Sequence, residues 1–296
     1  MSTKHVAIHF AFLAPCIWGT TYFVTTEFLP PDRPLLAAVV RALPAGLILI
    51  SGQKLPSISW LLRLFVLGSL NIGLFFVLLF VAAYRLPGGL VALVGSFQPL
   101  IVILLSFFLL TRSVTRKQLI AAVVGGIGVV LLISLPDKPL DTLGVIAALL
   151  ATTSMASGLV LTKKWGRPSD MKLITFTGWQ LFCGGIIILP IQIIFESFPH
   201  SISMINLAGY FYLAIPGSLL AYFAWFAGVE ANSPVAMSLL GFISPIVALL
   251  LGFVFLSQGL SAAQVVGAVL IFSAILGAQE KIRFMHRSKS PLHNSL

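Results

Sequence analysis

The sequence predicts an all-α integral membrane protein in which ten transmembrane helices form two inverted five-helix repeats. Three observations lead to this prediction: an apolar composition, ten separate hydrophobic stretches and an internal repeat. Of the 296 residues, 58% are hydrophobic and 9% are charged, and the mean hydropathy is +1.06. A soluble domain carries roughly 25% charged residues. Hydrocarbon is therefore the expected solvent, and in hydrocarbon a helix satisfies its own backbone hydrogen bonds.

Ten hydrophobic stretches are long enough, or nearly long enough, to cross a bilayer as helices. The gaps between them are rich in Pro, Gly and charged residues, which interrupt helices. The first stretch is expected to be a true span, because no small-residue cleavage site of a signal peptide precedes a soluble body. The predicted spans are residues 6–28, 33–52, 60–84, 87–111, 116–134, 141–163, 171–195, 204–229, 233–256 and 261–279.

The two halves of the chain resemble each other. Residues 86–132 align with residues 232–278 at a constant shift of 146 and without a gap. Each half holds five spans, an odd number, so the second half enters the membrane from the opposite side. Inverted repeats of this kind are typical of secondary transporters, whose substrate site lies near mid-depth. The predicted divisions are a first repeat at 6–134, a second at 141–279 and a basic cytoplasmic tail at 280–296.

The basic residues predict the orientation of the chain. With a cytoplasmic N-terminus, 14 of the 18 Lys and Arg residues fall on the inner side, three fall on the outer side, and Arg41 lies within a span. The positive-inside rule therefore places both termini in the cytoplasm. The formal charge of +10 is expected to meet anionic lipid headgroups rather than nucleic acid. No cofactor is predicted, and no metal-ligand spacing occurs in the sequence.

Aromatic residues form stripes at helical spacing. They recur four residues apart in the third span, at the equivalent positions of the eighth span, and again in the first span, so each set shares one helix face. One interpretation is a substrate path, because ring faces hold apolar groups and attract ammonium groups. The alternative is that these rings face lipid or pack the bundle. The aromatic candidates for substrate binding are Trp18, Tyr22, Phe76, Phe80, Tyr84, Trp179, Tyr222 and Phe226.

Pro99 and Pro245 occupy equivalent positions in the fourth and ninth spans. Each proline removes one backbone hydrogen bond and loosens its helix. Gln98 and Ser244, one residue earlier, are candidates for binding the freed carbonyl groups or the substrate. The two prolines are interpreted either as hinges of alternating gates or as static kinks for tight packing. The further hinge candidates are Gly88, Gly89 and Pro216.

Arg41 is the one basic residue well inside a predicted span, and Gln180 holds the equivalent position of the second half. An unpaired cation in lipid costs several kcal/mol, so Arg41 is expected to face protein or water. One interpretation is that Arg41 binds a substrate carboxylate, with Gln180 as a second candidate binding residue. The other is that Arg41 bonds helix-end carbonyls or Glu27 and organises the bundle.

Short motifs in a fixed order give the chain a family resemblance. It resembles the EamA branch of the drug/metabolite transporter superfamily over roughly residues 8–278. Arg112 and Gln258 stand where that family usually has Glu. The resemblance implies two tandem five-helix units in a bacterial inner membrane and export of small metabolites, with exporters of amino acids, aromatic ones included, as the nearest characterised relatives. The motifs are Trp18-Gly19-Thr20, Arg41, Ala82-Ala83-Tyr84, the pair Pro99 and Pro245, and the pair Gln118 and Gln264.

The expected function is secondary export of small neutral metabolites, most of all amino acids, by alternating access. The alternative is a multidrug carrier, or an efflux carrier for other metabolites such as nucleosides or sugar-like compounds. A membrane enzyme would need a polar catalytic cluster near one interface, and the sequence contains none. A phosphate-binding loop is also absent, which excludes ATP drive within this chain.

Few charges lie within the spans. No Asp, Glu or His occupies the middle of one, so transport is expected to be facilitated or only weakly coupled to protons. A zwitterion, which helix dipoles and rings can hold, fits this composition better than a phosphate. A monomer is expected to suffice, and a homodimer through the glycines of residues 125–128 stays open.

Overall fold

The computed structural model describes residues 3–86, 88–111, 115–132, 141–255 and 261–278, without the side chains of residues 3–9, 88, 89 and 252. Every regular element within these ranges is a helix. The predicted tail, residues 280–296, lies outside them. The elements are α1 (Thr3–Gly19), α2 (Thr21–Phe28), α3 (Pro34–Ile50), α4 (Ile58–Gly68), the π-helical segment η1 (Ser69–Gly73), α5 (Leu74–Arg85), α6 (Gly88–Gly95), α7 (Gln98–Leu110), α8 (Arg116–Leu132), α9 (Thr142–Trp165), α10 (Leu173–Phe195), α11 (Met204–Ala214), the π-helical segment η2 (Ile215–Leu220), α12 (Ala221–Ala231), α13 (Pro234–Leu240), α14 (Ile243–Phe255) and α15 (Ala262–Ala278).

Six helical segments of the described chain are long and apolar enough to cross a membrane, and two shorter apolar helices accompany them, at Pro34–Ile50 and Ala262–Gly277. An all-helical membrane protein is thus confirmed, while the count of ten spans stays a prediction. The six long segments are Ile58–Arg85, Leu90–Leu110, Thr142–Trp165, Leu173–Phe195, Met204–Ala231 and Pro234–Phe255.

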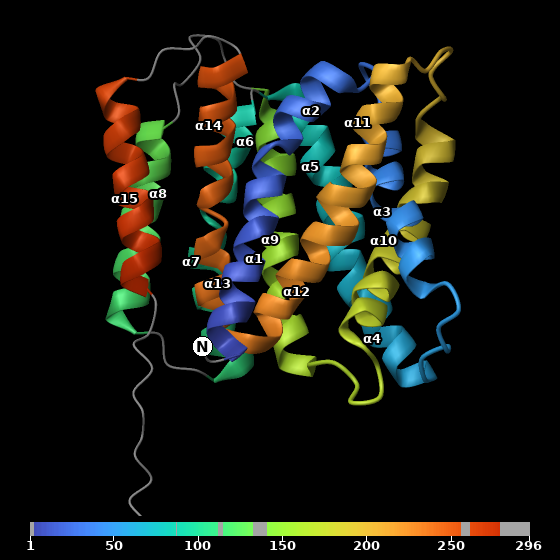
Figure 1. The fold of residues 1–296 in the computed structure, drawn as a ribbon, viewed down its shortest axis with the longest axis horizontal. Helices are drawn as coiled ribbons and strands as arrows, with labels where there is room; N and C mark the ends of the chain where they lie inside the picture. The colour runs from blue at the N-terminus through green and yellow to red at the C-terminus, as the bar shows by residue number, and fades with distance from the viewer. Residues whose placement is uncertain (1–2, 87, 112–114, 133–140, 256–260, 279–296) are drawn as a thin grey trace, which may run out of the picture.

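Helices of the first half pack against their counterparts in the second half. Helix α3 lies against α10, and α8 lies against α15. The contact of α1 with α12 is matched by the contact of α9 with α5. Figure 1 shows α8 and α15 side by side at one end of the long axis, and it shows α1 beginning and α15 ending at the lower end of the bundle. This exchange of partners is the pattern that a twofold relation between the halves produces.

Two glycines allow α3 and α10 to approach closely. A Cβ added to Gly46 would lie 2.4 Å from the backbone nitrogen of Phe182, and one added to Gly185 would lie 2.8 Å from the Cα of Leu43. Small residues at a helix crossing let the two backbones touch. Gly46 and Gly185 hold equivalent positions of the repeat, so each half supplies one side of the same contact.

The two π-helical segments also occupy equivalent positions, since Ser69 and Ile215 are separated by the repeat shift of 146. Wide turns of this type are rare and occur mostly at functional sites. In η2, Pro216 carries no backbone N–H, so the carbonyl of Tyr212 loses its usual helical donor. The sequence analysis treated Pro216 as a hinge candidate, and the structure places it at the start of this wide turn.

The chain breaks before each of the paired prolines. Helix α6 ends at Gly95 and α7 begins at Gln98, while α13 ends at Leu240 and α14 begins at Ile243. Pro99 and Pro245 lie in the first turn of the helix that follows, where a missing N–H costs no helical hydrogen bond. The helices are therefore interrupted at the predicted places, and the gating role stays a prediction.

Gly88 and Gly89 are the first two residues of α6. The sequence analysis listed them as hinges, and the structure puts them inside a helical turn rather than in the loop before it. A hinge at this point would therefore have to unwind the start of α6.

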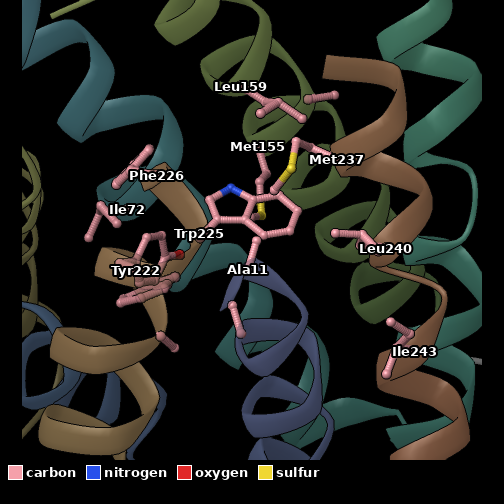
Figure 2. Packing of buried hydrophobic residues seen from close by; sticks show 14 of the residues in the cluster. Ala11, Ile72, Met155, Leu159, Tyr222, Trp225, Phe226, Met237, Leu240 and Ile243 are labelled. Atoms are coloured by element: carbon pink, nitrogen blue, oxygen red, sulfur yellow. The ribbon is translucent and has the colours of Figure 1, made fainter. Parts of the chain in front are cut away.

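The hydrophobic core joins both halves. Figure 2 shows the indole of Trp225, from α12, lying between Ala11 of α1, Met155 of α9 and Met237 of α13. Trp225 is 2% exposed and Met237 is fully buried. Four helices thus converge on one aromatic ring, and this junction forms the floor of the cavity described next.

Candidate functional site

A partly enclosed cavity of about 110 Å³ lies between the two halves. A single water needs only about 10–15 Å³ of such space, so this cavity holds a group of several heavy atoms. Its wall includes both helix breaks, through Gly95 and Ser96 on one side and Gly241 and Phe242 on the other. The cavity therefore lies at the one place where both interrupted helices meet the core.

Several residues singled out from the sequence line this cavity. They come from five separate helices, which the fold brings together around one space. The lining residues among the candidates are Trp18, Tyr22, Arg41, Gln98, Pro99, Ser244 and Pro245.

Other candidates do not line it. Tyr84 donates a hydrogen bond from its hydroxyl to the carbonyl of Pro30, at 3.0 Å, near the end of α5. Trp179 packs edge-on against Phe182, with ring centroids 5.7 Å apart. Phe226 packs against the rings of Phe176 and Tyr222. These side chains pack within the bundle around the cavity and are not part of the cavity wall.

Phe76 and Phe80 are fully buried and face Arg41 instead of the cavity. The guanidinium carbon of Arg41 lies 4.6 Å from the ring centroid of Phe76 and 5.9 Å from that of Phe80. Rings at these distances stabilise a cation electrostatically. The neighbouring residues Phe75 and Leu79 form the wall in their place.

The cavity also contains residues that the sequence analysis missed. Trp225 and Thr21 line it, as do Thr152 and Ser238. Thr21 lies three positions after Trp18, so the helical spacing of the first stripe was a signal that could have found it. The other three carry no comparable pattern, because apolar neighbours surround them on every side of their helices.

A backbone carbonyl of η2 holds two cavity residues. The indole nitrogen of Trp18 donates to the carbonyl oxygen of Gly217 at 3.0 Å, and Nη2 of Arg41 donates to the same oxygen at 3.4 Å. Arg41 is 1% exposed and makes no ion pair within the described residues, with Glu27 or any other carboxylate. Its Nε and Nη1 atoms have no hydrogen-bond partner there either.

The equivalent position of the second half is polar and carries no charge. Nδ2 of Asn71, in η1, donates to Oε1 of Gln180 at 2.8 Å and to the hydroxyl of Thr162 at 3.1 Å. Tyr222 donates from its hydroxyl to the carbonyl of Asn71 at 3.2 Å. Asn71 and Gly217 are repeat partners, as are Gln180 and Arg41. The same crossing thus holds a neutral amide, whose Nε2 has no hydrogen-bond partner in the described chain, in one half and a cation with two unpaired nitrogen atoms in the other.

The charge of the cavity wall is positive. Arg41 is the one charged residue among the lining residues that the structure describes, and none of those residues is Asp, Glu or His. A buried cation without a countercharge is costly in an apolar medium. The site is therefore suited to an anionic or acceptor-rich group.

Polar contacts tie the helices together beyond the cavity. At the end predicted to face outside, the carboxylate of Glu196 accepts the N–H groups of Leu35 and Leu36, at 2.8 and 2.7 Å, and so caps α3. Arg85 pairs with Asp141 at 3.1 Å. The N–H of Gly144, together with this guanidinium, lowers the pKa of the Asp141 carboxyl.

At the opposite end, Arg167 forms an ion pair with Glu230. Lys163 donates from Nζ to the carbonyls of Val229 and Glu230, at 2.9 and 2.8 Å, where α12 ends. A cation at a helix C-terminus is favoured by the helix dipole. Polar contacts at both ends of the bundle thus join segments that lie far apart in sequence.

The EamA-like transporter family matches residues 5–134 and 142–278. The chain belongs to this family. The two matched stretches nearly coincide with the two predicted repeats, and the resemblance seen in the sequence is confirmed. As a member of the EamA family, the protein is a transporter and not an enzyme.

The chain is also similar to two named relatives and to one solved structure. Protein PecM of Dickeya dadantii (strain 3937) is 70% identical over 287 residues, which cover 97% of each chain. A probable amino-acid metabolite efflux pump of Salmonella typhimurium (strain LT2) is 27% identical, over 90% of this chain and 92% of the pump. A solved crystal structure with 19% identity superposes with a TM-score of 0.77, over 93% of this chain and 96% of the other, and so shares the fold.

Proposed function

We propose that this EamA family member is a secondary exporter of small neutral metabolites, amino acids including aromatic ones, across a bacterial inner membrane. The observation that carries the proposal is Arg41, buried in a cavity between the two halves with two donors unpaired. An arginine fork matches a carboxylate in geometry and charge. The Salmonella relative is named as an amino-acid metabolite efflux pump, which supports this substrate class.

In the proposed complex, the substrate carboxylate binds Arg41. Its apolar side chain lies against the ring faces of Trp18, Phe75 and Trp225, which line the same space. The ammonium group meets ring faces and the carbonyls freed at the two helix breaks. The charges of a zwitterion are in this way matched without an acidic side chain.

Alternating access follows from the paired breaks. The proposal is that α6–α7 and α13–α14 bend at their interrupted turns, one pair opening toward each side of the membrane. No lining residue of the described chain is an acid, so the substrate gradient is proposed as the main driving force.

The proposed arrangement is an inverted pair of five-helix units with both termini in the cytoplasm. The pairing of α3 with α10 and of α8 with α15 supports it. A monomer already contains both halves of the cavity, so it is proposed to be the working unit.

The test is substrate flux through purified protein in sealed lipid vesicles. Labelled tryptophan and threonine are expected to leave preloaded vesicles in a saturable manner. Losing a charge-assisted hydrogen bond costs about 1.5–3 kcal/mol, so Arg41→Gln should slow this flux by roughly tenfold or more. Arg63→Gln is the control, since Arg63 is exposed on α4 over the ring of Trp60.

Two results would argue against the proposal. Flux of a lipophilic cation without flux of any amino acid would favour the multidrug alternative. An Arg41→Gln variant as fast as the wild type would remove the binding role of the buried cation.

A further inference from the structure

Four buried polar atoms of the cavity residues have no hydrogen-bond partner in the described chain. They belong to three side chains that meet from α2, α3 and the start of α7. The atoms are Nε and Nη1 of Arg41, Nε2 of Gln98 and the hydroxyl oxygen of Thr21. Leaving buried donors unpaired is unfavourable, so these atoms call for a partner that enters from the cavity.

Three other polar side chains of the wall have already used their hydroxyl protons, whereas the hydroxyl of Tyr22, which also lines the cavity, forms no hydrogen bond with the described chain. Thr152 donates to the carbonyl of Ala148 at 2.8 Å, and Ser238 donates to that of Val235 at 2.9 Å. Ser244 donates to the carbonyl of Pro15 at 2.9 Å. The unused hydrogen-bonding capacity of the wall therefore belongs to the hydroxyl of Tyr22 and to the three side chains with buried unpaired atoms, Thr21, Arg41 and Gln98.

The unpaired atoms of this set are mainly donors and its one charged group is a cation, although Oε1 of Gln98 and the hydroxyl oxygen of Thr21 can also accept. Arg41 and the amide nitrogen of Gln98 can only donate, and Thr21 has a hydroxyl proton to give. The cavity wall offers no carboxylate to an incoming ammonium group. A ligand group that accepts several hydrogen bonds and carries negative charge fits the set, and an ammonium group does not.

We propose that Thr21, Arg41 and Gln98 form a carboxylate-binding subsite, and that this subsite rather than an ammonium site selects the substrate. The inference rests on the proposed function and deepens it. The substrate class becomes ring-bearing carboxylic acids, among which aromatic amino acids are one case. The rings of Trp18 and Trp225, on the same wall, hold the planar part of the ligand.

The experiment compares tryptophan with two analogues that each lack one charged group. Indole-3-propionate lacks the ammonium group, and tryptamine lacks the carboxylate. Each compound is tested as a competitor of tryptophan efflux from vesicles and as a ligand that raises the melting temperature of the purified full chain. Indole-3-propionate is expected to compete within about fivefold of tryptophan, and tryptamine at least about tenfold more weakly.

Substitutions in the subsite then test whether its side chains cause the preference for the acid over the amine. Thr21→Val and Gln98→Leu are expected to weaken the acid at least about fivefold and to leave the amine unchanged. Gln98→Glu, which keeps the size and introduces a negative charge, is expected to favour tryptamine over the acid. The matched control is Thr25→Val, because Thr25 is buried one turn later, donates to the carbonyl of Thr21 at 2.8 Å and does not line the cavity.

The outcomes separate this inference from the proposed function. Tryptamine binding as tightly as indole-3-propionate, or no binding of indole-3-propionate, overturns the inference even if tryptophan is transported. Selective binding of the acid without any flux sustains the subsite and overturns the export proposal. A Gln98→Glu variant that still prefers the acid also contradicts the inference.

Discussion

At the scale of single residues, the carbonyl oxygen of Gly217 has the largest effect on the cavity. It accepts hydrogen bonds from both Trp18 and Arg41, so it fixes a ring and a cation with one acceptor. The oxygen is available because it belongs to a π-helical turn, in which the regular carbonyl-to-amide ladder is displaced. The rings of Phe76 and Phe80 make cation–π contacts with the same guanidinium group.

The equivalent network around Asn71 gives a prediction about stability. A Cβ on Gly158 would lie 2.2 Å from Oδ1 of Asn71, whose side chain is held by two hydrogen bonds and cannot simply turn aside. Overpacking of this kind costs about 1–3 kcal/mol. Gly158→Ala is therefore expected to lower the unfolding temperature in detergent.

Gly126→Ala is the matched control, since a Cβ there has no atom within 4 Å. It is expected to be neutral, or to stabilise by up to about 1 kcal/mol through its better helix propensity. Equal melting temperatures for the two variants would show that the Asn71 network tolerates the extra methyl group.

Residue spacing predicted the cavity only in part, and the reason is physical. Trp18, Tyr22 and Arg41 were found because a polar or amphipathic group in an apolar span is rare. The stripe of Phe76 and Phe80 was assigned to the path, although adjacent residues of the same helix line it. A membrane helix is apolar all round, so periodicity identifies a face without saying whether that face meets lipid, protein or a cavity.

At the scale of elements, the interruptions of the helices determine which residues line the cavity. The breaks before Pro99 and Pro245 were predictable, because proline removes a backbone donor. The π-helical segment η1 was not predicted, since it contains no proline, although Asn71 is a polar residue within an apolar stretch. Only the structure shows that η1 and η2 are a symmetric pair.

Pro216 gives the prediction at this scale. Pro216→Ala restores a backbone N–H, which favours a regular α-helical turn and draws the Gly217 carbonyl into the helical ladder. Trp18 and Arg41 then lose their common acceptor, and transport is expected to fall at least about fivefold in the vesicle flux assay. The control is Pro190→Ala, because Pro190 is exposed on α10 and lies away from the cavity.

A Pro216→Ala protein with unchanged flux would mean that the wide turn persists without its proline, as η1 does. Infrared or hydrogen-exchange measurement of the α11–α12 segment would then show whether the turn had changed at all.

At the scale of the whole molecule, the two halves are proposed to face opposite sides of the membrane. Loops on either side of α10 offer a direct check, since Ser169 precedes this helix, Ser201 follows it, and both are exposed. In a background with Cys16→Ala and Cys183→Ala, Ser201→Cys is expected to react with a membrane-impermeant maleimide on intact cells. Ser169→Cys should react only after the membrane is opened.

The reverse pattern would place both termini outside and contradict the charge-based orientation. Labelling of both cysteines on intact cells would mean that α10 does not cross the membrane. The cysteine-free background, which should show no labelling, controls for reaction at other sites.

The all-helical membrane fold was predictable from composition, while the inverted arrangement that parity predicts stays a prediction. A repeat of five spans leaves one geometric solution, whereas a cavity depends on side chains that converge from helices far apart in the chain. The contacts of α3 with α10 and of α8 with α15 agree with that solution.

The α8–α15 pair lies outside the cavity wall. None of its described residues lines the cavity, and its contacts include α6, α7, α13 and α14, the four pieces of the two interrupted helices. Much of its outer surface is apolar and exposed, as at Ile127 and Val266. If the interrupted helices are the gates proposed above, the surrounding lipid acts on them through this pair without contacting the cavity wall. A cell that thickens or thins its bilayer would in this way alter how fast the carrier turns over before altering what it carries.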